Sequence, residues 1–240
     1  MTPALSFEGV SIHFPLPGGG GENPVVTDLS MSIEPGERVA LLGLNGSGKT
    51  TLQRAVVGLV PFEGRISVGG VEVAPRTLDS VRAQVGVLFN VPEDQILFPR
   101  VLDDVAFGPR RQGLVREEAW ERARRSLSQL GVGDLADRQV FELSHGQKLR
   151  VALAGVLVLE PSVLLLDEPT AGLDPPGLGQ LVAALGEQSA ALLVATHDLD
   201  FAERLCSRQL LLSEGRIAYD GESVGPVRER WGLPSGRGST

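Results

Sequence analysis

The sequence predicts an α/β fold: a mixed sheet with parallel strands at its centre, an antiparallel β-subdomain and an inserted helical subdomain. Apolar runs of the kind expected for strands buried on both faces end at Leu42, Phe89, Leu166 and Ala195. Near the N-terminus, apolar and polar residues instead alternate, as in antiparallel strands with one solvated face. Residues 91–159, between the second and third buried runs, carry mainly the spacing of helices.

The antiparallel part of the predicted fold comprises residues 5–14, an alternation over residues 29–33, and a hairpin over residues 65–73 that turns at two glycines. The alternation slips after Phe7, and a β-bulge or a turn would explain this slip. The N-terminal part of the chain is therefore expected to be mainly antiparallel.

We expect one domain whose core lobe is built from two separate parts of the chain. A loop with four consecutive glycines is expected to be flexible, and a C-terminal tail rich in Gly, Pro and Ser is expected to fray. The core lobe is assigned to residues 1–90 together with residues 160–219, and the helical subdomain to residues 91–159. The flexible loop comprises residues 15–24, and the tail comprises residues 221–240.

Composition limits the partners of this chain. Its 240 residues include 22 Lys and Arg against 30 Asp and Glu, so the net charge is −8. An acidic chain is a poor fit to nucleic acid, because phosphate backbones require clustered basic side chains. Several arginines do gather, but glutamates interleave with them, which favours a solvated helical face. These arginines are Arg110, Arg111, Arg116, Arg122, Arg124 and Arg125.

The sequence indicates no membrane span of its own. The apolar run 151–159 is far shorter than the roughly 20 residues that a spanning helix needs. No basic segment followed by an apolar one opens the chain, so no secretion signal is expected. The single cysteine, Cys206, cannot form an internal disulfide, which fits a reducing cytosol. Any association with a membrane is expected to be peripheral and to depend on a partner.

Residues 43–50, GLNGSGKT, match the phosphate-loop pattern G-x-x-x-x-G-K-[ST], and they lie between an apolar run and a helix predicted over residues 49–60. Such glycines let backbone N–H groups surround phosphate oxygens, while Lys49 adds positive charge. Thr50 offers a hydroxyl to Mg²⁺. The alternative is a glycine-rich turn that binds nothing. The candidate nucleotide-binding residues are Gly43, Asn45, Gly46, Ser47, Gly48, Lys49, Thr50 and Thr51.

Two carboxylates follow the buried run 163–166, at the strand end where ligands bind in parallel sheets. Asp167 can reach the shell of a Mg²⁺ ion. Glu168 can point the other way and act as a general base on a water molecule. The alternative is a solvated helix cap before Pro169. The phosphate loop upstream favours the site.

A second anion site is indicated by residues 143–147, LSHGQ, which precede a buried helix. Ser144 would lie at the N-terminus of that helix. Its hydroxyl, the N–H groups near Gly146 and the helix dipole could then hold an anion together with Gln147. The alternative is that Ser144 only caps a core helix.

These three segments, followed by TAGLD at 170–174 and THD at 196–198, together resemble an ATP-binding cassette (ABC) ATPase of the P-loop NTPase class. The resemblance covers about residues 5–219. It implies that Ser144 and its glycine face the γ-phosphate held by the phosphate loop of a second subunit. Two ATP molecules would then lie between the subunits of a head-to-tail dimer, and hydrolysis would require dimerisation.

The same resemblance implies roles for three further residues. Phe14 would stack on adenine, although it could also be a core residue. Asp174 would contribute a carboxylate across the dimer interface, or cap the following helix. His197 would contact the γ-phosphate, or be a structural histidine. With Glu168 and Lys49, His197 completes the candidate catalytic set.

This chain departs from the family pattern at two positions. Asn90 stands where the family has a glutamine that joins Mg²⁺ and the attacking water and marks the contact to the membrane part. Asparagine keeps the amide but is one methylene shorter, so its reach to the metal is in question. Gln95 is nearby but is assigned to the next element. His145 replaces the commonest glycine of the signature and is interpreted as a tolerated variant.

A narrower resemblance is carried by PEDQILF at 92–98, by DDVAFGP at 103–109 and by the residues around the signature. These segments are similar to the cobalt/nickel and energy-coupling-factor (ECF) branch of ABC ATPases. That resemblance implies a motor subunit that drives uptake of metal ions or vitamins. Its partners would be a second ABC ATPase subunit, a transmembrane coupling protein and a substrate-binding membrane component, at the cytoplasmic face of the membrane.

Two alternatives of other kinds remain at this point. The chain could be a soluble ABC ATPase acting on DNA or ribosomes, but such proteins usually have a second cassette, a coiled coil or basic tracts. It could also be a nucleotide-gated regulatory partner with little activity of its own, which the asparagine at position 90 keeps open.

Overall fold

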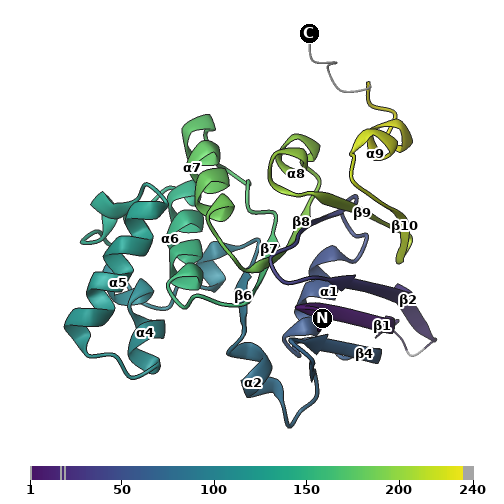
Figure 1. Cartoon of the computed structure of the whole chain (residues 1–240), viewed down its shortest axis with the longest axis horizontal. Coiled ribbons are helices and arrows are strands. Elements are labelled where there is room, and N and C mark those ends of the chain that lie inside the picture. Colours follow the sequence, from purple (N-terminus) through teal and green to yellow (C-terminus); the bar gives the residue numbers. More distant parts are fainter. Residues whose placement is uncertain (1, 17, 19, 235–240) are drawn as a thin grey trace.

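The computed structural model describes residues 2–16, 18 and 20–234, and it contains two β-sheets surrounded by helices (Figure 1). The smaller sheet is antiparallel, with the strand order β2-β1-β4-β5. These strands are β1 (Leu5–Pro15), β2 (Glu22–Ile33), β4 (Glu63–Val68) and β5 (Val71–Glu72). The predicted antiparallel subdomain is confirmed.

The larger sheet has six strands in the order β10-β9-β3-β8-β7-β6. All neighbouring pairs are parallel except β9 with β10. The strands are β3 (Arg38–Leu42), β6 (Val85–Leu88), β7 (Val163–Asp167), β8 (Ala191–Thr196), β9 (Arg208–Ser213) and β10 (Arg216–Gly221). This mixed sheet confirms the predicted fold class.

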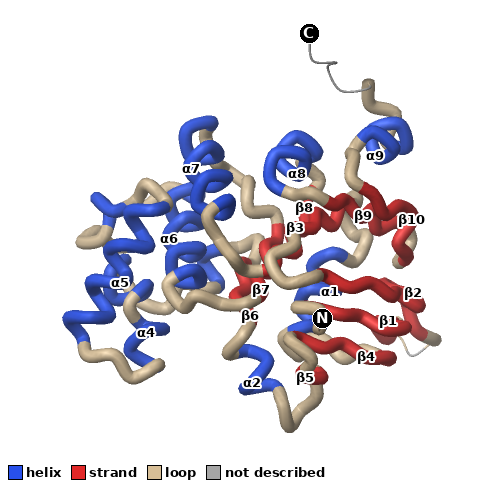
Figure 2. The backbone as a smooth tube through the Cα atoms, viewed as in Figure 1, coloured by secondary structure: helices blue, strands red, loops and turns tan. Residues whose placement is uncertain are grey.

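Helices cover the parallel strands and also form a separate group. Figure 2 shows α4, α5 and α6 on the side of the molecule away from the antiparallel strands. The α-helices are α1 (Lys49–Val56), α2 (Leu78–Arg82), α3 (Val101–Val105), α4 (Phe107–Arg111), α5 (Arg116–Gln129), α6 (His145–Leu157), α7 (Pro175–Gly186), α8 (Leu199–Leu205) and α9 (Gly225–Arg230). Three 3-10 turns, η1 (Pro92–Asp94), η2 (Gly133–Leu135) and η3 (Val140–Glu142), complete the helical elements of the described residues.

The parallel sheet is buried on both faces, which explains its uninterrupted apolar runs. In β7, Leu164 and Leu166 pack into one hydrophobic core with the helices α3, α5 and α6. Leu165, which points the other way, packs into a second core with α1 and the antiparallel strands. Because successive side chains of a strand face opposite sides, each strand serves both cores.

The structure also shows the irregularity expected in β1 and one shorter element. The pairing of β1 with β2 shifts between Phe7 and Val10, and Gly9 has a φ of 58° there. The expected slip after Phe7 is thus a bulge. The first helix ends at Val56, not at Val60, because the chain turns before Gly58, whose φ of 70° suits glycine.

Two expectations about loops need revision. Within the segment 15–24, Pro15 pairs with Glu22 as the last pair of the β1–β2 ladder, so the connection between the strands is shorter than the expected loop. Residues 17 and 19 of this connection lie outside the described residues. The tail was expected to fray from residue 221. That expectation is wrong for α9, because Val227 is fully buried in the core, whereas residues 235–240 lie outside the described part. No helix in that part is long and apolar enough to span a bilayer.

Candidate active site

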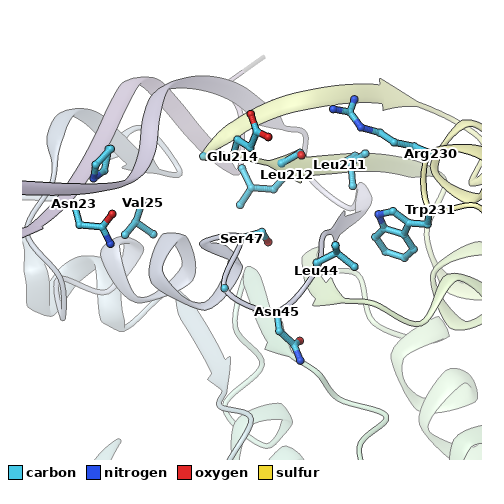
Figure 3. Close-up of a pocket in the computed structure, with 14 residues that line it drawn as sticks. Asn23, Val25, Leu44, Asn45, Ser47, Leu211, Leu212, Glu214, Arg230 and Trp231 are labelled. Atoms are coloured by element: carbon cyan, nitrogen blue, oxygen red, sulfur yellow. The ribbon is translucent and has the colours of Figure 1, made fainter.

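Most phosphate-loop residues, Asp167 at the end of β7 and Glu168 directly after it line one cavity of about 500 Å³ at the carboxyl ends of β3 and β7. Its lining comprises Val25, Asn45, Gly46, Ser47, Gly48, Lys49, Thr50, Thr51, Asn90, Asp167 and Glu168. A second cavity of about 630 Å³ lies along the first half of the loop. Figure 3 shows Asn45 and Ser47 between Asn23 and Val25 on one side and Leu44 and Trp231 on the other. The fold thus brings together segments that lie more than a hundred residues apart.

The glycines shape a cradle for an anion. Gly46 and Gly48 have φ values of 80° and 103°, and residues that carry a side chain rarely adopt such values. A Cβ on Gly48 would lie 3.0 Å from the carbonyl oxygen of Val25. The helix α1 begins directly after this turn, and its N-terminus has no side-chain cap. Its free N–H groups and its dipole therefore favour a phosphate at this point.

The side chain of Lys49 folds over the phosphate loop and is bound by backbone carbonyl groups of that loop. Its Nζ donates to the carbonyl oxygens of Gly43 at 2.8 Å and Leu44 at 3.3 Å, and lies 3.8 Å from Oε1 of Glu168. Burial lowers the pKa of Lys49, and the nearby carboxylates of Glu168 and Asp167 partly oppose this shift. The amino group of Lys49 is therefore held at the cradle by two carbonyl oxygens and by a longer ion pair with Glu168.

Thr50 and Asp167 form the candidate metal site. Thr50 Oγ1 donates to Asp167 Oδ2 at 2.7 Å. Asp167 is 2% exposed, and its Oδ1 has no hydrogen-bond partner within the described part of the chain. Burial raises the pKa of Asp167, against the hydrogen bond from Thr50. A hydroxyl and a buried carboxylate with one free oxygen fit Mg²⁺, which is often bound by one or two carboxylates together with substrate phosphates.

Glu168 is positioned by three side chains. Its Oε1 lies 3.0 Å from Nδ1 of His197, and its Oε2 accepts a hydrogen bond of 3.1 Å from the hydroxyl of Thr196. Lys49 approaches the same carboxylate. The backbone of Glu168 adopts a φ of 48°, an uncommon left-handed conformation for a residue with a side chain. Such conformations persist where the surroundings hold them, and they occur often at active sites.

Thr196 opens the segment THD but has no role of its own in the sequence pattern, and it is fully buried at the end of β8. Its hydroxyl contacts Glu168 and also accepts from the backbone N–H of Asp198. The available signal was a polar residue that ends an apolar strand directly before His197. The partner, 28 residues away in sequence, could not be inferred.

Asn90 lies exposed on the cavity lining, together with Asp167 and Glu168. Gln95 is used elsewhere. Its side chain accepts from the N–H of Phe89 at 3.1 Å and donates to the carbonyl of Val87 at 2.6 Å. Gln95 therefore fixes the end of β6, and of these two amides Asn90 is the one that lines the candidate site.

The signature serine does not line its own chain's phosphate cavity. Ser144 is exposed and caps α6, accepting from the N–H of Gln147 at 3.3 Å, while Gln147 Oε1 accepts from the N–H of Ser144 at 2.9 Å. Gly146 packs so closely that an added Cβ would lie 2.6 Å from the carbonyl of Gly172. The capping role is confirmed, and a role toward a second subunit stays a prediction.

Two other candidates also lie apart from this cavity. Phe14 is 39% exposed near the end of β1, opposite Asn23, so it is not a core residue in this chain. Its stacking on adenine stays a prediction, although Asn23 does line the second cavity. Asp174 caps α7 by accepting from the N–H of Gly177 at 2.9 Å. Asp174 is exposed, so this cap is compatible with a place at a dimer interface. That place stays a prediction.

The fold and the site together define a nucleoside-triphosphate-binding domain with a hydrolytic centre. The family described as ABC transporter matches residues 26–171, and the chain belongs to the ABC transporter family as its ATP-binding, ATP-hydrolysing subunit. It is 44% identical over 218 residues to an ABC transporter ATP-binding protein of Brucella suis, covering 90% of this chain and 89% of the relative.

Other relatives carry more specific names. The cobalt import ATP-binding protein CbiO of Rhodobacter capsulatus is 39% identical over 242 residues, covering 98% of this chain and 85% of the relative. The structure of CbiO1 from Clostridium perfringens, part of the ABC transporter complex CbiONQ, superposes with a TM-score of 0.81 at 33% identity. That superposition covers 96% of this chain and 92% of CbiO1. The chain is similar to these proteins along almost its whole length.

Proposed function

We propose that this chain is the ATP-hydrolysing motor subunit of an importer of the CbiO or ECF type, carrying cobalt or nickel ions or a vitamin. The observation that carries the hydrolytic part is the placement of Glu168 between Thr196 and His197, beside Lys49 and Asp167. The similarity to a cobalt import protein over 98% of this chain supports the cargo class. Among the described residues, nothing specifically favours a soluble ABC ATPase acting on DNA or ribosomes.

In the proposed reaction, the side chains act by positioning and by compensating charge. Glu168 orients a water molecule and accepts its proton, since His197 and Thr196 hold both of its carboxylate oxygens. Lys49 turns from two neutral carbonyls toward the β- and γ-phosphates. Bound Mg²⁺ would neutralise phosphate charge, held by Thr50 and Asp167 with Asn90 on the same cavity wall.

We propose that the signature residues serve a second subunit. Ser144, Gly146 and Gln147 form the N-terminus of α6, yet they do not line the cavity of their own chain. An exposed helix N-terminus with a serine hydroxyl can bind a phosphate brought to it by another copy. Asp174 is exposed. It lies near the same signature turn, because Gly172, two residues before it, packs against Gly146. The second subunit is another copy of this chain or a sister ATPase.

We also propose where the membrane component docks. A groove of about 860 Å³ runs between the end of β6 and the helical segment, and Gln95 lies on its wall. Large apolar side chains that line it, Leu97, Phe107 and Leu159, are 36% exposed or more. A helix of a transmembrane coupling protein would cover them. The chain would thereby be held at the cytoplasmic face of the membrane. The groove would lie one loop away from Asn90.

The proposal is tested by reconstituting the chain with its coupling and substrate-binding membrane components in liposomes. We expect ATP hydrolysis together with uptake of radioactive cobalt or nickel, or of a labelled vitamin. The Lys49→Ala variant is the matched negative control, because it removes the mobile charge at the phosphate cradle. Hydrolysis without uptake of any of these cargoes would refute the importer assignment. Equal nucleotide affinity of Lys49→Ala and the unmodified chain would refute the phosphate-loop assignment.

A further inference from the structure

A buried glutamine lies directly behind the candidate site, where α1 meets two strands of the parallel sheet. Gln53 is 2% exposed and lies one helical turn after Lys49. Its Nε2 donates to the carbonyl oxygen of Leu166 at 3.1 Å and to that of Leu193 at 3.0 Å. One side chain therefore joins α1 to both β7 and β8.

Both acceptors lie next to residues of the site. Leu166 directly precedes Asp167, and Leu193 lies three residues before Thr196 on β8. On the same helix, Thr50 donates to Asp167 at 2.7 Å. Thus α1 and β7 are connected twice within one helical turn, once through Thr50 to the carboxylate and once through Gln53 to the backbone just before it.

Stability alone does not explain a glutamine at this place. Its neighbours on α1, Leu52, Ala55 and Val56, all belong to an apolar core. The Oε1 of Gln53 has no hydrogen-bond partner within the described part of the chain. A buried acceptor without a partner is unfavourable, and an apolar side chain of similar size would avoid that cost. Local conflicts of this kind tend to occur where function requires a fixed geometry.

We propose that Gln53 is a positioning residue for the metal site. It holds α1 against β7 at the spacing at which Thr50 Oγ1 and Asp167 can both contact one Mg²⁺ ion. Gln53 acts through these two residues and does not touch the nucleotide. The inference rests on the proposed ATP hydrolysis. Partners that orient metal ligands typically contribute about 10- to 100-fold to metal affinity or activity.

The test replaces the amide with an apolar group of similar length, Gln53→Met, with Gln53→Leu as a second variant should the first fail to fold. The chain offers a matched control in Gln209, which is 1% exposed, donates to the carbonyl of Cys206 at 2.9 Å and also has an unpartnered Oε1. Gln209 lies near the start of β9, at the opposite end of the sheet from the site. The Gln209→Met variant removes a buried amide without touching α1.

Three measurements separate positioning from a purely structural role. Nucleotide affinity is measured in EDTA, Mn²⁺ affinity of the nucleotide complex by electron paramagnetic resonance, and kcat by steady-state hydrolysis. We expect Gln53→Met to keep its metal-free nucleotide affinity and to lose about tenfold or more in both Mn²⁺ affinity and kcat. Gln209→Met should change none of the three.

Unchanged Mn²⁺ affinity and kcat in a folded Gln53→Met variant would overturn the positioning role. So would an equal loss in Gln209→Met, because the effect would then follow from any buried amide. If the unmodified protein with nucleotide bound no Mn²⁺ and hydrolysed no ATP, the proposed function itself would fail. That result is distinguishable, since it does not depend on Gln53.

Discussion

The hydroxyl of Thr196 donates a hydrogen bond of 3.1 Å to Oε2 of Glu168, and thereby ties the end of β8 to the carboxylate that follows β7. The same hydroxyl accepts from the N–H of Asp198. This bond leaves Oε1 to His197 and Lys49. Thr196 therefore determines which carboxylate oxygen faces the other two groups.

We expect Thr196→Val, which keeps the shape and removes the hydroxyl, to lower kcat. A net hydrogen-bond contribution of about 1 kcal/mol corresponds to a loss of roughly fivefold. Thr196→Ser is the matched control and should hydrolyse ATP nearly as fast as the unmodified chain. Steady-state hydrolysis by both variants, with any required membrane component present, checks this. Equal kcat for the valine and serine variants would show that the bond does not matter for turnover.

Glu168→Gln should separate binding from turnover. The amide keeps the size and can still contact Thr196 and His197, but it cannot accept a proton. We expect kcat to fall by about 10²- to 10⁴-fold, the usual contribution of a general base, with ATP affinity retained. Rapid-quench hydrolysis and equilibrium nucleotide binding measure the two quantities. Turnover near the unmodified rate would remove Glu168 from the catalytic role.

Much of this fold could be predicted from the sequence, because the strands of the parallel sheet are buried on both faces and so appear as plain apolar runs. The phosphate loop and the pair Asp167 and Glu168 were recognisable because each is a contiguous pattern at a strand end. Gln53 lies in no such pattern, and Thr196 appears only as the first residue of THD, without a role of its own. The partner of Thr196 is 28 residues away, and that of Gln53 is more than a hundred residues away. A single polar residue in an apolar run does not indicate which distant residue it will contact.

The signature segment shows a different limit. Ser144 was identified by pattern, yet within one chain it only caps α6. Its predicted phosphate belongs to another subunit, so neither the pattern nor a single chain can display the complete site. The helix α9 was missed for a third reason. Its Gly and Pro content indicates a loop, whereas the burial of Val227 against distant residues stabilises a helix.

The amide of Asn90 is expected to act on the metal site. Asn90 is exposed on the cavity wall, and Gln95 is occupied at the end of β6, so no other amide of that segment lines this cavity. We expect Asn90→Ala to lower kcat by roughly tenfold, as for a lost metal-site partner. Asn90→Gln, with its longer reach, should keep kcat at or above that of the unmodified chain. Hydrolysis titrated with Mg²⁺ checks both variants. Unchanged kcat in Asn90→Ala would show that the shorter amide does not reach the metal.

Arg208 and Asp220 form a bidentate ion pair. Arg208 donates from Nε and Nη2 to the two carboxylate oxygens of Asp220, both at 2.7 Å, which joins β9 to β10. The hydrogen bond from Arg208 lowers the pKa of Asp220 below its ordinary value of 3.8. A carboxylate with a lowered pKa stabilises the fold above the unfolded-state pKa, and this contribution is lost as the pH falls through the folded-state pKa.

Asp220→Asn should therefore unfold at a lower temperature than the unmodified protein near neutral pH, and the difference should shrink as the pH falls below 3.8 toward the lower folded-state pKa of Asp220. Asp220 is 46% exposed, so solvent screening limits the effect to within about 1 kcal/mol, or about 2–4 °C. Glu203→Gln on α8 controls for the loss of one surface charge. Thermal unfolding followed by circular dichroism across this range provides the measurement. A difference that did not change between neutral pH and acid solution well below pH 3.8 would mean that Asp220 stabilises the hairpin by a contact other than its charge.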